Sequence, residues 1–269
     1  ANKVAALGAF SSTGFSFTNG QTLTVNGPLN GGASVALTTT AGNLAINGAV
    51  SGTTTTLKSA GAISESATGG ITAATLTGQS NGATALNGAN HIGSLGSFSA
   101  ANFALTNAQA LTVSGPVSGG ASTALTTTAG NLVVNGAVSG TTTTLKSAGT
   151  ISEGAGGSIV AGTLAGQSSG ATTLNGANHV GALGNFSAAN FALTNAQALT
   201  VSGPVNGGAS TTLTTTAGDL AIKNPVRNTT TQLPSAAAIT EGAGDSITEH
   251  LLTGHSIGHA TLDGNNHID

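Results

Sequence analysis

The densest group of chemically active side chains lies close to the C-terminal end of the sequence. His250, His255 and His259 fall within ten residues, and Asp245 and Glu249 come just before them. A zinc ion needs such ligands on one face, at about 2.0–2.2 Å from the metal. In an extended strand, His250 would lie on the face opposite His255 and His259, unless the intervening glycines turn the chain. These three histidines are weak candidates for a metal site, and a solvated coil without metal is the interpretation we favour.

Three glutamates recur at a fixed spacing of 88 residues, namely Glu65, Glu153 and Glu241. Glycoside hydrolysis needs a pair of carboxyl groups across the scissile bond, and no second carboxylate accompanies these residues. A bare buried carboxylate would cost several kcal/mol, so we expect each glutamate to turn outward at a Gly-rich corner. No nucleophile–base pair is present either. The sequence therefore predicts no catalytic residue, no cofactor and no enzyme.

Threonine clusters and phenylalanine pairs are the remaining candidates. The threonine runs span residues 38–40, 53–56, 126–128, 141–144, 214–216 and 229–231. An ice-binding face would need continuous threonine rows, but these runs fall at different phases, so we interpret them as solvent-facing β-branched residues. Phe98 with Phe103, and Phe186 with Phe191, would form either an aromatic ridge for a partner or an extra strand packed against the main body. We expect packing.

Charge and composition exclude several classes of protein. Only 5% of the 269 residues are charged, and five Lys and Arg residues in a chain of net charge −3 cannot form a phosphate-binding surface. Nucleic acid is therefore not an expected partner. The absence of cysteine excludes disulfides, thiol catalysis and Cys-based zinc sites. No run of 18 apolar residues is present, so membrane insertion as a helix is not expected.

An internal repeat of 88 residues organises the chain. Asn2, Asn90, Asn178 and Asn266 show this spacing, and several prolines and phenylalanines keep it. The repeats are residues 2–89, 90–177 and 178–265, and residues 266–269 begin a fourth. Since the chain starts and stops at nearly the same phase, we expect a single array, 1–269, that is an excerpt of a longer chain. A period of this kind is examined first because it decides the fold.

Each repeat divides into units of about 20 residues. Leucine, valine and isoleucine recur in three ladders, which we align as Leu111, Leu132 and Ile151; Val117, Val138, Ile159 and Val180; and Leu125, Leu145, Leu164 and Leu183. Local alternation and Gly/Asn/Ser turns indicate short strands. The pattern predicts an all-β fold, a right-handed parallel β-helix (β-solenoid) of about twelve coils stacked about 4.8 Å apart. An antiparallel sandwich or a leucine-rich repeat fits less well.

The units NLVVNGAVSG, ALTVSGPVSG and TISEGAGGSI resemble the degenerate repeats of filamentous-haemagglutinin-like exoproteins and autotransporter passenger domains of Gram-negative bacteria. The resemblance covers essentially the whole chain. It implies a β-helical stalk, export to the cell surface or medium, and roles in adhesion, aggregation or biofilm. A host or cell-surface receptor would then be bound by domains outside this sequence.

Taken together, the residues and the resemblance lead to one expected function and two alternatives. We expect the structural, repetitive stalk of a secreted or surface-exposed bacterial adhesin, with self-association end to end or laterally. The first alternative is a subunit or segment of a self-assembling extracellular filament. The second alternative is an ice-binding solenoid.

Overall fold

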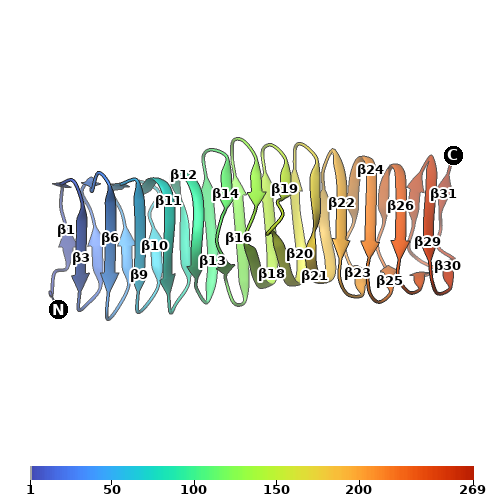
Figure 1. Cartoon of the computed structure of the whole chain (residues 1–269), viewed down its shortest axis with the longest axis horizontal. Helices are drawn as coiled ribbons and strands as arrows, with labels where there is room; N and C mark the ends of the chain where they lie inside the picture. Colours follow the sequence, from blue (N-terminus) through green and yellow to red (C-terminus); the bar gives the residue numbers. More distant parts are fainter. Residues whose placement is uncertain (1) are drawn as a thin grey trace. The chain divides into compact units, whose positions relative to one another are not determined.

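The computed structural model describes residues 2–269, and it contains β-strands and no helix over that range. Parallel strands stack in about 13 turns of about 20 residues, which defines a β-solenoid and confirms the predicted fold class. The chain divides into two compact units, Ala1–Leu132 and Val133–Asp269. Figure 1 shows the strands of each unit as successive arrows lying side by side.

The strands of the first unit are β1 (Ala6–Leu7), β2 (Phe10–Ser11), β3 (Phe15–Asn19), β4 (Leu23–Val25), β5 (Leu29–Asn30), β6 (Ser34–Thr39), β7 (Leu44–Ile46), β8 (Ala49–Ser51), β9 (Thr54–Ser59), β10 (Ile63–Glu65), β11 (Gly70–Ser80), β12 (Thr84–Ser99), β13 (Asn102–Asn107), β14 (Leu111–Val113), β15 (Val117–Ser118) and β16 (Ser122–Thr127). Strand β17 (Leu132–Val134) falls at the boundary.

The strands of the second unit are β18 (Ala137–Ser147), β19 (Ile151–Glu153), β20 (Ser158–Ser168), β21 (Thr172–Ser187), β22 (Asn190–Asn195), β23 (Leu199–Val201), β24 (Val205–Thr215), β25 (Leu220–Ile222), β26 (Val226–Ser235), β27 (Ile239–Glu241), β28 (Ile247–Glu249), β29 (Leu251–Ser256), β30 (Ala260–Leu262) and β31 (His267–Ile268).

Alternation of apolar and polar residues places one ladder inside each unit and one outside. In the first unit, Leu23 pairs with Leu44 and Leu44 with Ile63, all in parallel register and all at most 1% exposed. The residues between them, such as Thr24 and Ala45, point outward and stack in the same way. A single coil could not bury its apolar face, so the core exists only because neighbouring coils cover one another.

Two of the predicted ladders are shifted in the second unit. Leu164 lies on Thr143 rather than on Leu145, and Leu145 faces Gly166. Val180 lies on Ala161 rather than on Ile159. The alignment assumed that the nearest apolar residues stack, but backbone pairing follows a spacing of 21 residues across this coil. The core accepts the mixed column because Thr143 is itself fully buried.

The seven-residue extension at 191–197 is part of the solenoid wall. Its residues Asn190–Asn195 form β22, which pairs with β21 before it and β24 after it. A repeat of 88 residues therefore holds more than four coils of about 20 residues, which is why the solenoid has about 13 turns rather than the predicted twelve.

Local backbone geometry also repeats every 88 residues. Gly42, Gly130 and Gly218 have φ values of 75°, 74° and 76°, in the left-handed region that favours glycine. A Cβ on Gly42 would also lie 2.7 Å from the backbone nitrogen of Thr22 on the preceding coil. The corner after each six-residue strand thus requires glycine for two reasons.

We predict that Leu145→Ala lowers the free energy of unfolding by about 2–5 kcal/mol, because it leaves a cavity in a fully buried position. Val160→Ala is the control, since Val160 is 48% exposed, and its effect should stay within about 0.5 kcal/mol. Urea unfolding followed by circular dichroism measures both. Equal effects of the two changes would contradict the placement of Leu145 in the core.

Candidate functional site

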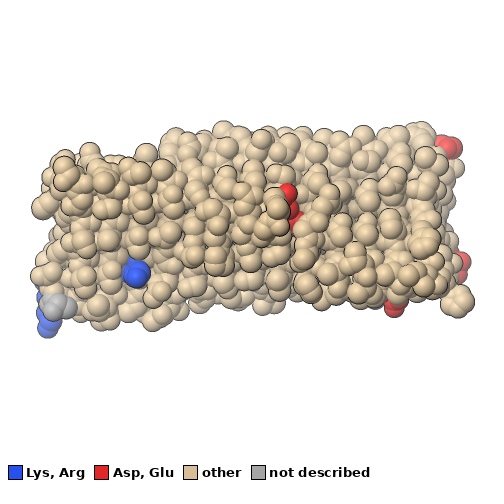
Figure 2. Space-filling view, in the orientation of Figure 1, with Lys and Arg blue, Asp and Glu red and all other residues tan. Residues whose placement is uncertain are grey.

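The surface carries very little charge, so a functional site has to be sought among neutral polar side chains. Figure 2 shows one face on which most residues are neither acidic nor basic. In the first unit, Asn30, Ser51, Thr72 and His91 lie in register on four successive coils and all point outward. We call these four residues the polar ladder.

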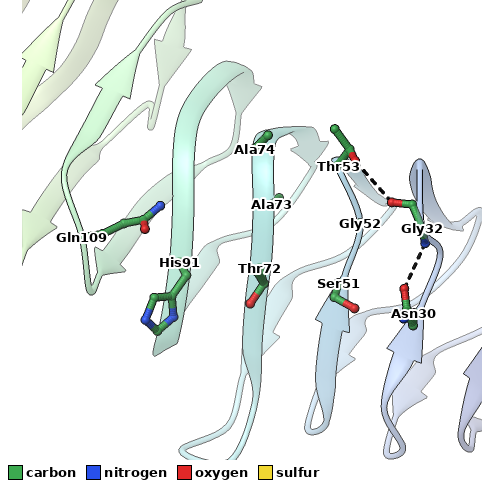
Figure 3. A pocket seen from close by; sticks show the side chains of 10 residues that line it. All are labelled: Asn30, Gly32, Ser51, Gly52, Thr53, Thr72, Ala73, Ala74, His91 and Gln109. Carbon is green, nitrogen blue, oxygen red and sulfur yellow. Dashed lines mark hydrogen bonds between the residues drawn. The ribbon is translucent and has the colours of Figure 1, made fainter.

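A shallow groove of about 740 Å³ runs over the polar ladder. Figure 3 shows its lining, which adds Gln109 and the small residues Gly32, Gly52, Thr53, Ala73 and Ala74. The Asn30 side-chain oxygen accepts a hydrogen bond from the Gly32 amide at 3.0 Å, and the Thr53 hydroxyl donates to the Gly32 carbonyl at 3.4 Å. The groove offers hydrogen bonds to a neutral ligand, but no carboxylate lines it to orient His91 as a base.

The groove is not reproduced in the next repeat. Val160 stands at the position equivalent to Thr72, and it is 48% exposed beside His179. The ladder therefore loses a hydroxyl at its centre, although the surrounding sequence is nearly copied. Because the polar groove belongs to one repeat only, it differs from the features that every repeat shares.

The three candidate metal ligands do not converge. His250 follows β28, His255 lies in β29, and His259 precedes β30, and all three side chains are exposed. Over residues 2–269, no group of three or more His, Asp or Glu side chains is placed to hold a metal ion. His91 and His179 point outward, as the sequence analysis expected, and His267 forms an ion pair of 2.9 Å with Asp269.

The repeated glutamates are turned toward the interior, and the expectation that they point outward is wrong. The Glu65 Oε2 accepts hydrogen bonds from the Gly88 amide at 2.6 Å and the Asn90 side-chain amide at 2.8 Å. Glu153 makes the same two bonds with Gly176 and Asn178, at 2.7 and 2.9 Å. We call this arrangement the Glu–Asn clasp.

The clasp recurs in the third repeat and explains why the spacing of 88 residues is kept. Glu241 is 7% exposed and accepts from Gly264 at 3.2 Å and from Asn266 at 2.7 Å. These donors partly offset the cost of burying a carboxylate, which was the reason for expecting an outward position. The motif Gly-x-Asn, found 23 and 25 residues after each glutamate, is the sequence signal that could have revealed the clasp.

Burial raises the pKa of the Glu65 and Glu153 carboxyl groups above the usual 4.5, and the hydrogen bonds from the clasp asparagine and glycine oppose this rise in part. Desolvation disfavours the charged form, so the folded solenoid holds a proton on these groups more readily than the unfolded chain does. No second titratable group faces them within the clasp. The clasp is therefore a structural element that responds to pH and not an acid–base pair.

A second set of buried asparagines was missed altogether by the sequence analysis. Asn19, Asn107 and Asn195 are fully buried at the end of a six-residue strand face. The Asn195 side chain accepts from the Val180 amide at 2.8 Å and donates to the Val180 carbonyl at 2.9 Å. Each such asparagine replaces backbone pairing where the chain turns, which satisfies polar groups that would otherwise be buried unpaired.

The threonine and phenylalanine candidates serve mainly in packing. Thr55, Thr143 and Thr231 each point into the core and are fully buried, although the threonine clusters were expected on the surface. Outward columns mix residue types, as where Thr38 is followed by Lys58 and Gln79. The Phe98 and Phe103 rings pack 4.7 Å apart inside the solenoid, which confirms packing and leaves no aromatic ridge there.

Comparisons with known proteins add no name to this β-solenoid. Neither the protein-family models, nor the curated proteins, nor the solved structures contain a match to the chain. Over residues 2–269, no helix is long and apolar enough to cross a membrane.

We predict that the double variant Glu65→Gln, Glu153→Gln flattens the dependence of stability on pH. A raised carboxyl pKa contributes stability that is complete below about pH 4.5 and is lost as the pH rises through the folded-state pKa. The free energy of unfolding of the unmodified chain should therefore fall more between pH 4 and pH 8 than that of the variant. Asp263→Asn, at an exposed carboxylate, is the control. An opposite slope would show that the clasp favours the ionised form.

Asn195→Ala should lower the free energy of unfolding by about 1–3 kcal/mol, because it leaves the amide and carbonyl of Val180 without their buried partner. Asn206→Ala removes an exposed asparagine from the same unit and should have little effect. Chemical denaturation of both variants checks the difference. Matching midpoints would mean that water or backbone rearrangement replaces the Asn195 bonds.

Proposed function

We propose that the chain is a structural, repetitive stalk of a secreted or surface-exposed bacterial adhesin. The observation that carries the proposal is the faithful recurrence of internal devices every 88 residues. The Glu–Asn clasp, the buried asparagines and the left-handed glycines all hold one coil on the next. Selection on such a chain acts on the stack itself, as expected for an element whose function is to extend and to persist.

The outward side chains support the same proposal. The polar groove lacks the carboxylate that would orient His91, and the histidines at 250, 255 and 259 point separately into solvent. Function is argued from sites rather than from folds, and these residues supply hydrogen-bonding surface without a reactive pair. We therefore favour a mechanical role over an enzymatic one, with the receptor bound by domains outside this sequence.

Export to the cell surface is the localisation that fits this proposal. The sequence has no cysteine, so it cannot be cross-linked by periplasmic oxidation before secretion. A stack of small coils also needs no cofactor to fold, since each coil is templated by the coil before it. Both properties suit a long chain that folds outside the cell.

Deletions inside the full-length protein test the proposal. Removing residues 90–177 joins equivalent positions and keeps the stacking register, so export and cell adhesion should be retained. Removing residues 90–133 is the matched control, because it joins positions of different phase and should abolish surface display. Immunolabelling of intact cells and a whole-cell adhesion assay measure the two outcomes. Loss of adhesion with normal display after the in-phase deletion would place a binding site in the repeat and overturn the stalk role.

An extracellular filament is the second candidate, and one observation favours it. Large apolar side chains are exposed in the first and last coils, namely Phe10 at 52%, Leu251 at 53%, Ile257 at 76% and Ile268 at 47%. A surface of this kind marks a contact with another molecule. Electron microscopy of the native material distinguishes an assembled filament from a stalk of one chain.

A further inference from the structure

Strands in the first and last coils are paired along one edge only within residues 2–269. In the first unit, β1 pairs with β4, and β3 with β6. In the second unit, β29 pairs with β26, and β30 with β27. A free strand edge is a template for pairing with another chain. The question is therefore which partner fits these edges.

Each unit contains an internal contact that shows what a coil of this type receives from the next coil. A Cβ on Gly78 would lie 2.6 Å from the Phe98 ring, and a Cβ on Gly166 would lie 2.9 Å from the Phe186 ring. Both rings are only 2% exposed. The glycine is needed because a phenylalanine of the following coil covers it.

The same contact is incomplete at two other places in the chain. Gly254 comes 88 residues after Gly166, and a Cβ there would meet only Leu233 of the preceding coil, with its carbonyl oxygen at 3.1 Å. Phe10 comes 88 residues before Phe98, yet its ring is 52% exposed. One coil thus has a glycine without its phenylalanine, and another has a phenylalanine without its glycine.

We propose that copies of this chain associate head to tail, with Phe10 of one copy covering Gly254 of another. A pocket of about 240 Å³ beside Gly254 is lined by Leu233, Ile239, Leu252, Ala260 and Leu262, which are the open end of the core. Phe10 lies in a pocket of its own with Ala9 and Pro28. The apolar surfaces on the two sides are those that Phe186 and Gly166 bury inside the second unit.

The internal pairs also give the register of the joint. Leu164 pairs with Leu183, so Leu252 should pair with Leu7 of the second copy. Gln167 pairs with Ser187, so His255 should pair with Ser11 of the second copy. The β30 edge should receive β3 in the same way, because Thr172 pairs with Phe191.

One segment of the second copy has to yield when the joint forms. Its Asn2 bridges to Asn19, and its Val4 exchanges two hydrogen bonds with the Asn19 side chain, at 2.9 and 2.8 Å. Asn266 and Ile268 occupy the equivalent phase, and Val180 makes the same two bonds with Asn195. Residues 266–269 of one copy can therefore replace residues 2–5 of the next.

Charge favours this partner over random contact between open edges. Residues 2–64 carry two lysines and no acidic residue, whereas residues 241–269 carry five acidic residues and no Lys or Arg. On the face drawn in Figure 2, blue atoms lie among the first coils and red atoms among the last. Opposite charges steer the two surfaces together, while like surfaces repel.

Engineered cysteines test the register directly, because the chain has no cysteine of its own. Ser11→Cys and His255→Cys chains, mixed and oxidised, should form a disulfide-linked dimer. Asn47→Cys mixed with His255→Cys is the control, since Asn47 is equally exposed but out of register. Absence of the dimer, or equal cross-linking in the control mixture, would overturn the proposal. The test is independent of the stalk role, which depends on cell adhesion.

Association constants from analytical ultracentrifugation provide the second test. Gly254→Ala fills the seat of Phe10 and should weaken self-association by about tenfold or more, as should Phe10→Ala. Gly244→Ala is the matched control, because a Cβ there meets nothing within 4 Å. Deleting residues 1–5 removes the competing segment and should strengthen association. Gly254→Ala chains that associate as tightly as the unmodified chain, or a deletion without effect, would overturn the joint as described.

Discussion

Everything in this protein depends on the hydrogen bonding of each coil to the coil before it in parallel register. Leu44 is buried because Leu23 and Ile63 lie directly on either side of it. The same register that covers apolar side chains also brings identical polar groups together, and this is where the fold needs special devices. The Glu–Asn clasp and the buried asparagines are such devices, since both saturate backbone or carboxylate groups that stacking alone would leave unpaired.

These devices explain a composition that would otherwise suggest disorder. With 42 glycines and 13 charged residues, the chain has little of the usual material for a folded domain. Glycine is required at corners such as Gly42, and also where another coil lies too close for a side chain, as at Gly166 under Phe186. Charge is scarce because in-register stacking would set each charge against a neighbour about 4.8 Å away.

The sequence was sufficient for the fold class and the repeat, because a period in apolar residues reports directly on stacking. It was not sufficient for the details that depend on which residue lies above which. Leu145 faces Gly166 rather than Leu164, since coil length varies locally between 19 and 21 residues. Burial of Glu153 was missed because its partners, Gly176 and Asn178, belong to the next coil. Only the three-dimensional register reveals that a polar side chain has a partner so far along the chain.

The extra strand in each repeat has a consequence for any molecule that touches the surface. In the first unit, the column that begins at Thr24 passes through Ala45, Ser64 and Ala85 and continues at Ala104, which corresponds to Ser16 and not to Thr24 in the repeat. Equivalent residues of consecutive repeats therefore lie around the axis like steps of a spiral staircase. A ligand bound to one face meets a changing series of side chains, so near-identical repeats still display a varied surface.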